Sequence, residues 1–140
     1  MTARRLLAFL LTALLVLPLT GCLGGGAKEV NTLTLVDAPT EGKVGDSLRI
    51  TYRIDGPEGT ARWNVLKWGY SSNPRDIGVK EEDYPNTVFE PGKQEKAPVP
   101  GTFTVELPLL REGKVYYRVH TVIGTQDLWS PEITVNVTAS

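Results

Sequence analysis

The sequence predicts an all-β protein, an antiparallel β-sandwich of about seven strands preceded by an apolar N-terminal helix and a flexible tether. Two observations lead to this fold class. From residue 30 onward, apolar and polar residues alternate with a period of two, and no window has the 3.6-residue apolar repeat of an amphipathic helix. Clusters of glycine and proline separate the alternating runs, as in a sandwich of short strands.

The N-terminus has the layout of a secretory signal. Arg4 and Arg5 precede an uncharged run over residues 6–17, and Pro18 and small residues follow. A helix that spans a bilayer needs roughly 20 apolar residues, and this run is shorter. A signal helix is therefore favoured over the alternative, a short uncleaved membrane anchor.

The only cysteine closes this signal, in Leu19-Thr20-Gly21-Cys22. The stretch resembles the lipobox of prokaryotic lipoproteins. The resemblance implies that residues 1–21 are a lipoprotein signal peptide and that Cys22 carries diacylglycerol as the first mature residue. It further implies a lipid-anchored chain on the extracytoplasmic side of the cell membrane or the outer membrane, with Leu23 weakly favouring the outer one. Residues 22–29, which are rich in glycine, would form the tether, and residues 30–140 the sandwich domain.

Composition excludes several classes of protein. With Cys22 lipidated, no thiol remains for a disulfide, a thiolate metal site or a cysteine nucleophile. The net charge of the chain is −1, and lysine and arginine form no cluster of the kind that binds nucleic acid. Because no thiol remains for a disulfide, the domain must be stabilised by its hydrophobic core.

The first two strands show the clearest alternation. Residues 31–36 place Leu33 and Leu35 on one face, and residues 47–54 place Leu48, Ile50, Tyr52 and Ile54 on one face. Turn residues separate them over 41–46, and a second turn follows over 55–59.

The next predicted strand, residues 61–70, is apolar on both faces. Trp63 and Val65 have one parity, whereas Leu66, Trp68 and Tyr70 have the other. Such a strand is either covered on two sides or contains a bulge that shifts its parity.

Residues 71–100 contain five prolines and only short apolar islands, at 77–79 and 88–89. We expect this stretch to lie along the edge of the sandwich, with one or two short edge strands. Alternation returns over residues 102–107, 114–123 and 131–137, with a loop around 124–127.

The last part of the chain resembles fibronectin type III domains. The resemblance rests on residues 110–121, LREGKVYYRVHT, and on residues 129–135, WSPEITV. It implies a fibronectin type III-like or immunoglobulin-like sandwich, in which Tyr116 takes the place of the corner tyrosine whose hydroxyl bonds back to the chain.

No motif indicates catalysis or a cofactor. His120 is the only histidine, and a lone histidine on an alternating strand is usually a surface or interstrand residue. The acidic run 81–83 lacks the spacing of a calcium loop, so a solvated turn is favoured over a metal site. Phosphate loops, nucleophile elbows and zinc motifs are absent from the sequence. We therefore expect no enzyme, no metal and no cofactor.

Two functions are compatible with this pattern. The first is a binding module that recognises a protein or glycan, with Trp68, Tyr70 and Tyr84 as the candidate binding surface, because they flank the long loop and aromatic faces offer large contact areas. The second is a structural or accessory lipoprotein that holds an envelope complex to the membrane without a small ligand. The alternative for the aromatic residues is that they fill the core.

Overall fold

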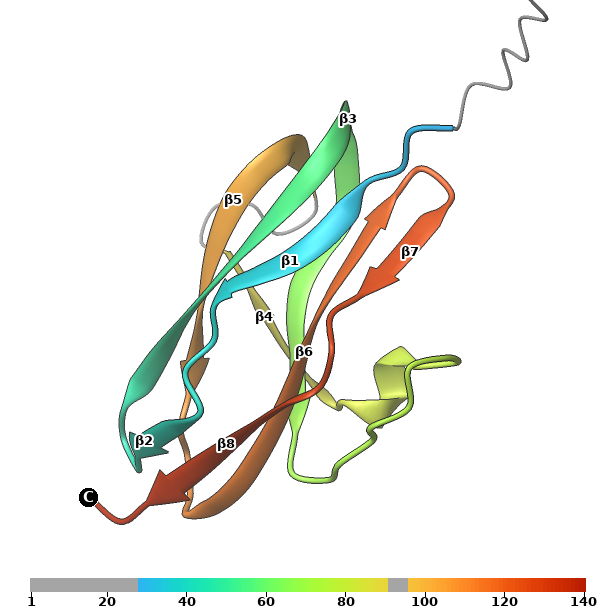
Figure 1. The fold of residues 1–140 in the computed structure, drawn as a ribbon. Helices are drawn as coiled ribbons and strands as arrows, with labels where there is room; N and C mark the ends of the chain where they lie inside the picture. The colour runs from blue at the N-terminus through green and yellow to red at the C-terminus, as the bar shows by residue number, and fades with distance from the viewer. Residues whose placement is uncertain (1–27, 91–95) are drawn as a thin grey trace, which may run out of the picture.

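The computed structural model describes residues 28–90 and 96–140, which form eight strands and one short 3-10 turn (Figure 1). The proposed signal, Cys22 and most of the tether lie outside the described residues. The elements are β1 (Thr32–Asp37), β2 (Glu41–Lys43), β3 (Ser47–Gly69), η1 (Glu81–Asp83), β4 (Asn86–Phe89), β5 (Ala97–Pro108), β6 (Gly113–Ile123), β7 (Gln126–Trp129) and β8 (Ile133–Thr138). The predicted all-β class is confirmed. None of the described residues belongs to a helix that is long and apolar enough to cross a membrane.

The strands form one curled sheet around the long strand β3 (Figure 1). The first half of β3 pairs with β1 and β5, and the second half pairs with β4 and β6. The pairing along β3 shifts between Ile54 and Gly59, where the sequence predicted a turn between two separate strands. Gly56 in this segment has φ +125°, a conformation that favours glycine, so the strand bends there instead of ending.

Two short strands were not predicted. Residues 41–43, expected as a turn, form β2, which pairs in parallel with β8. Residues 126–129, of which the first two were expected in a loop, form β7, which pairs with β6. The sheet is therefore mixed and not purely antiparallel. The expected short edge strand in the long loop region is present as β4.

A single apolar core lies inside the curled sheet. Alternate residues of β3, β5, β6 and β8 meet there, and Tyr52 stacks against Phe103 with ring centroids 5.5 Å apart. On β6 the side chains that face the core include Val115, Tyr117 and Val119. Tyr116, which the resemblance made the corner tyrosine, has the opposite parity and lies across from Thr134 of β8.

The second half of β3 is covered on both sides, one of the two alternatives that its sequence left open. Leu66 and Trp68 join the core, whereas Val65 and Lys67 on the opposite face are also buried. The pairing with β6 also shifts between Ala61 and Trp63. The outer face of β3 and β6 therefore lies under other parts of the chain, and the candidate site is found there.

Candidate functional site

The loop over residues 70–85, hereafter the 70–85 loop, joins β3 to β4 and contains η1. It leaves β3 in the half of the molecule opposite to the start of β1 (Figure 1). Where the loop returns to the sheet, Pro85 lies so close to Gly69 that a Cβ atom at Gly69 would be 2.9 Å from Cδ of Pro85. Glycine at the end of β3 therefore allows the loop to pack on the sheet.

The side chain that holds the loop is Arg118 of β6. Its neighbours Tyr117 and Val119 face the core, so alternation directs Arg118 to the outer face, where it is only 2% exposed. Its Nη2 group donates to the carbonyl oxygens of Asn73 and Arg75 at 3.0 and 2.8 Å. Its Nη1 group donates to the Ser130 carbonyl at 2.8 Å. One guanidinium thus joins the 70–85 loop to the segment between β7 and β8.

Tyr84 and Glu132 complete this polar cluster. Nε of Arg118 donates to the Tyr84 hydroxyl at 2.9 Å, and that hydroxyl donates to Oε2 of Glu132 at 2.5 Å. The Glu132 carboxylate also accepts from the Ser72 hydroxyl and the Asn73 backbone N–H, both at 2.6 Å. The cluster of Arg118, Tyr84 and Glu132 is called the loop clamp below.

The pKa values of the loop clamp follow from these contacts. Burial, together with the hydrogen bond to Glu132, raises the pKa of Tyr84 to about 12, although Arg118 opposes the shift. Burial works against ionisation of Glu132, but the hydrogen bonds from Ser72, Tyr84 and Asn73 and the charge of Arg118 outweigh it and lower its pKa. Glu132 is therefore ionised and Tyr84 neutral over the physiological range.

The loop is also braced within itself and has an apolar tip. Asp83 accepts from the Lys80 backbone N–H at 2.9 Å and pairs with Arg75 at 3.3 Å. Ile77 at the tip is 89% exposed, the largest exposed fraction among the large hydrophobic residues that the structure describes. It is followed by Gly78 with φ +72°, which turns the chain back. A braced loop therefore presents one isoleucine to solvent.

His120 lies next to the loop and is buried against β7, which fits the interstrand position of the two that the sequence left open, and not the surface one. Its ring stacks on Trp129 at a centroid distance of 3.8 Å, and Nε2 is 2.7 Å from Oδ1 of Asp127. Nδ1 is 3.5 Å from Oε1 of Glu81 and has no hydrogen-bond partner in the described structure. Burial lowers the pKa of His120, although Asp127 and Glu81 favour the cation. No three histidine, aspartate or glutamate side chains of the described residues are grouped so that they could hold a metal ion.

The residues chosen from the sequence do not form an exposed aromatic surface. Trp68 is 5% exposed and belongs to the core, and Tyr84 is fully buried in the loop clamp. Tyr70 is half-buried, with its ring nearly perpendicular to that of Trp68 and the Arg111 guanidinium 3.5 Å above its ring. The three lie at the ends of the loop as expected, but Trp68 faces the core, Tyr70 packs against the core, and Tyr84 is buried beneath the loop, so they form no common exposed surface.

Sequence reasoning did not identify Arg118 and Glu132 as site residues. A signal was present, because Arg118 interrupts the apolar run of β6 between two residues that face the core. An arginine in this place is normally an exposed side chain on the wet face of a strand. Only the return of the 70–85 loop over that face makes it a buried residue.

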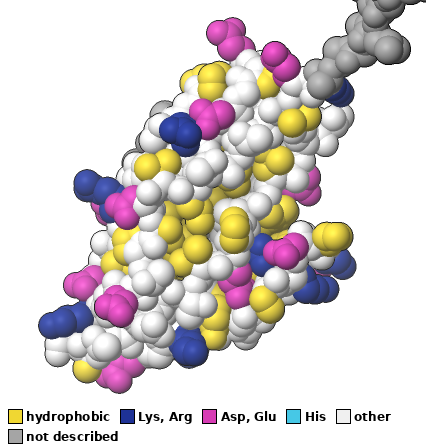
Figure 2. All heavy atoms as spheres, in the orientation of Figure 1, with side chains coloured by type: hydrophobic (Ala, Val, Ile, Leu, Met, Phe, Trp, Pro, Cys, Tyr) yellow, Lys and Arg dark blue, Asp and Glu magenta, His cyan; other side chains and the backbone are white. Residues whose placement is uncertain are grey.

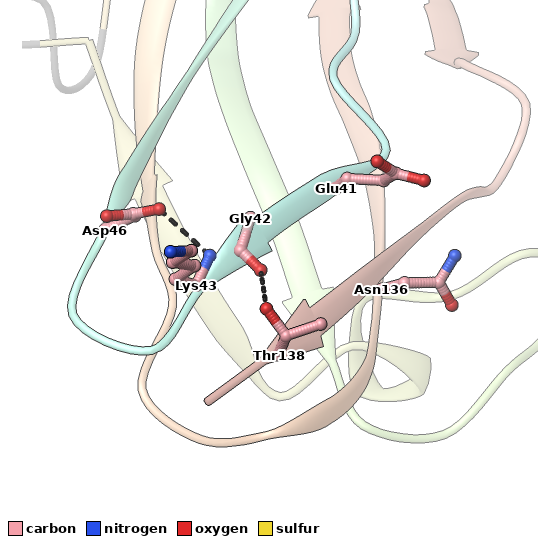
Figure 3. Close-up of a pocket in the computed structure, with 6 residues that line it drawn as sticks. All are labelled: Glu41, Gly42, Lys43, Asp46, Asn136 and Thr138. Carbon is pink, nitrogen blue, oxygen red and sulfur yellow. Dashed lines mark hydrogen bonds between the residues drawn. The ribbon is translucent and has the colours of Figure 1, made fainter. Parts of the chain in front are cut away.

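A shallow hollow of about 460 Å³ lies at the end of the molecule that holds the C-terminus (Figure 3). Its lining residues are Glu41, Gly42, Lys43, Asp46, Asn136 and Thr138. The charged side chains among them are exposed, and Asp46 already accepts the Lys43 backbone N–H at 2.9 Å to close a turn. The residues that line this hollow provide no buried polar group for a ligand, so the 70–85 loop is the better candidate for a functional site.

Comparison of the chain with protein-family models gave no match, and a search of curated proteins gave none either. The function is therefore inferred from the residues and their geometry.

Proposed function

We propose that this chain is a lipid-anchored, extracytoplasmic binding domain, not an enzyme, and that it contacts a partner protein through the 70–85 loop. The observation that carries the proposal is the loop clamp. A buried guanidinium is a costly way to stabilise a fold, because well-packed apolar residues often do as well. Here its hydrogen bonds go to loop carbonyls, so it specifies the shape of one loop.

The finer fold assignment is part of the same proposal. The N-terminal part of the chain pairs first with β3 as β1 and then, after Pro39, with β8 as β2. This exchange of partners, together with the bend in β3, supports an immunoglobulin-like or fibronectin type III-like sandwich. Loops at the ends of such sandwiches commonly bind partners.

Ile77 is the central contact residue in this proposal. An apolar side chain on a loop that is already ordered can enter a pocket of a partner with little further loss of conformational entropy. A protein fits better than a glycan, because the aromatic rings around the loop lack free faces: Trp68 and Tyr84 are buried, and Arg111 covers Tyr70.

The proposed lipid anchor is compatible with the placement of the loop. Lys28, the first described residue, belongs to the end of the proposed tether, and the 70–85 loop lies toward the other end of the molecule (Figure 1). Because the tether is flexible, a chain held at Cys22 would leave the loop free to face away from the membrane. Two or three acyl chains give stable membrane attachment, at about 0.8 kcal/mol per buried methylene.

The test compares Ile77→Asp with Leu110→Asp in the full-length chain, by chemical crosslinking in intact cells. Leu110 is a matched control because it is also a large exposed hydrophobic residue, at 63%, but lies between β5 and β6. We expect the yield of the partner that crosslinks to the wild type to fall at least tenfold with Ile77→Asp and to stay unchanged with Leu110→Asp. Equal recovery with both variants would contradict binding through the loop.

Anchoring is tested separately with Cys22→Ser. We expect this variant to leave the membrane fraction, whereas the Ile77→Asp chain stays in it. A Cys22→Ser chain that remains as firmly bound to membranes as the wild type would contradict the lipid anchor.

The second candidate function, an accessory lipoprotein without a ligand, is favoured by one observation, the edge of β1 with which no other described strand pairs. Strand addition to such an edge is a common route to assembly.

A further inference from the structure

Strand β1 is an edge strand whose protection is confined to its last residues, where Asp37 adds a charge and the register with β3 shifts between Leu35 and Asp37. It stands at one end of the strand order and pairs only with β3 among the described strands. Residues 32–36 contain no charge, proline or glycine. Edge strands normally carry such residues because an open edge pairs with other chains. Strand β5, on the other side of the first half of β3, has Pro98, Pro100 and Pro108.

The outward side chains of this segment suit strand pairing. Val30, Thr32, Thr34 and Val36 share one parity and are all exposed, Val30 by 54% and Val36 by 57%. All four are β-branched and uncharged, the type that packs well on a pleated surface. On the other face, Leu33 and Leu35 are half-buried against the core, and Figure 2 shows hydrophobic side chains gathered between β1 and β8.

The hydrogen bonds of Asn31 identify which backbone groups are available. Its N–H donates to Oε1 of Gln126 at 3.0 Å, and its carbonyl accepts from Nε2 of Gln126 at 3.3 Å. Gln126 is on β7, so these groups of Asn31 point away from β3. Backbone groups alternate in direction along a strand. Those of Leu33 and Leu35 therefore point to the same side as those of Asn31. They lie too far along the strand for the Gln126 side chain, which is bonded to Asn31, to reach them.

We propose that β1 pairs with β1 of a second copy of this chain, antiparallel and about a twofold axis at Thr34. In this register Leu33 and Leu35 of each copy exchange backbone hydrogen bonds with Leu35 and Leu33 of the other, four bonds in total. Thr34 faces Thr34 of the second copy, and Thr32 faces Val36. No charges lie opposite each other within residues 32–36, so identical strands pair without repulsion.

The chain that precedes β1 favours a second copy as the occupant. Only residues 22–31 separate the proposed lipid site from β1. A glycine-rich tether of this length reaches roughly 15–20 Å, so anchored copies would hold their β1 edges near one height above the membrane. The contact is isologous and uses both β1 edges. The prolines of β5 protect the opposite edges, so assembly stops at two copies.

The test is disulfide crosslinking of Thr34→Cys in the full-length chain in its native membrane, with Thr102→Cys as the control. Thr34 and Thr102 are both exposed and flank Arg53 on the same face of the sheet, but Thr102 is on β5. We expect a disulfide-linked dimer at least tenfold more abundant with Thr34→Cys. The wild-type lane reports any dimer formed through Cys22.

A second pair of variants confirms the contact without introducing a cysteine. Thr34→Lys places a charge at the centre of the proposed pairing and should abolish chemically crosslinked dimers, whereas Thr102→Lys should keep them. Equal disulfide yields from the two cysteine variants, or dimers that persist in Thr34→Lys, would overturn the proposal. Ile77→Asp should dimerise like the wild type, which separates this contact from binding through the 70–85 loop.

Discussion

The guanidinium of Arg118 and the hydroxyl of Tyr84 meet at 2.9 Å in a buried position, with the arginine as donor. The two residues are 34 positions apart in the chain. Their contact connects the central strand β6 to the end of the 70–85 loop, and four consequences of this arrangement and its surroundings can be measured.

Replacement of Arg118 by Leu should destabilise the protein. The carbonyl oxygens of Arg75 and Ser130 would lose their donor, that of Asn73 would keep only the Tyr84 hydroxyl at 3.1 Å, and a buried polar group left unpaired costs about 1–3 kcal/mol. We expect the free energy of unfolding in urea to fall by about 2–4 kcal/mol. The control is Arg49→Leu. The Arg49 side chain is 72% exposed and pairs with Glu106 at 3.7 Å, so its replacement should lower the free energy of unfolding by less than about 1 kcal/mol. Similar losses for both variants would contradict the role of Arg118.

Tyr84 should make the protein sensitive to alkali. Its pKa is about 12 in the folded protein against the ordinary 10.0, so its contribution to stability is complete below pH 10 and is lost as the pH rises toward 12. Burial raises the pKa values of Tyr52 and Tyr117 in the same direction. We expect Tyr84→Phe to lose part of this dependence, measured as the unfolding midpoint in urea between pH 9 and pH 12. An unchanged slope would contradict the assignment.

His120 should make the stability of the protein sensitive to acid. Because burial lowers its pKa below the ordinary 6.5, the unfolded chain binds a proton more readily. Its contribution to stability is therefore complete above pH 6.5 and decreases as the pH falls toward the folded pKa. The imidazole resonances in NMR are unambiguous because the chain has one histidine. A pKa at or above the ordinary value would show that Asp127 and Glu81 outweigh burial.

Substitution of Gly69 should displace the 70–85 loop. An added Cβ atom would be 2.9 Å from Pro85, and overpacking of this kind costs about 1–3 kcal/mol. Gly59→Ala is the control, since its Cβ would meet Ile123 and Val99 at ordinary distances of 3.7 and 3.8 Å. Amide exchange over residues 70–85 should accelerate in Gly69→Ala and stay unchanged in Gly59→Ala. Protection equal to the wild type in both variants would contradict the close packing at Gly69.

Prediction from the sequence was most accurate where one face of a strand is buried. The alternation of Ile50, Tyr52 and Ile54 specified a core face, and all three are fully buried. It was least accurate for segments whose pairing depends on distant strands. Residues 41–43 look like a turn in isolation, yet they form β2 because β8 supplies hydrogen-bond partners from almost 100 residues away.

For the candidate site too, local features could be predicted from the sequence and long-range contacts could not. The sequence by itself determined the all-β class, the positions of most strands and the approximate place of an irregular segment, predicted over residues 71–100 although β5 already begins at Ala97, because periodicity and turn residues are local properties. Only the tertiary structure decided that Trp68 and Tyr84 are buried, that Arg118 holds the 70–85 loop and that Ile77 is left at its tip. Those outcomes depend on which sheet face the loop covers, and that is decided by contacts between residues far apart in the chain.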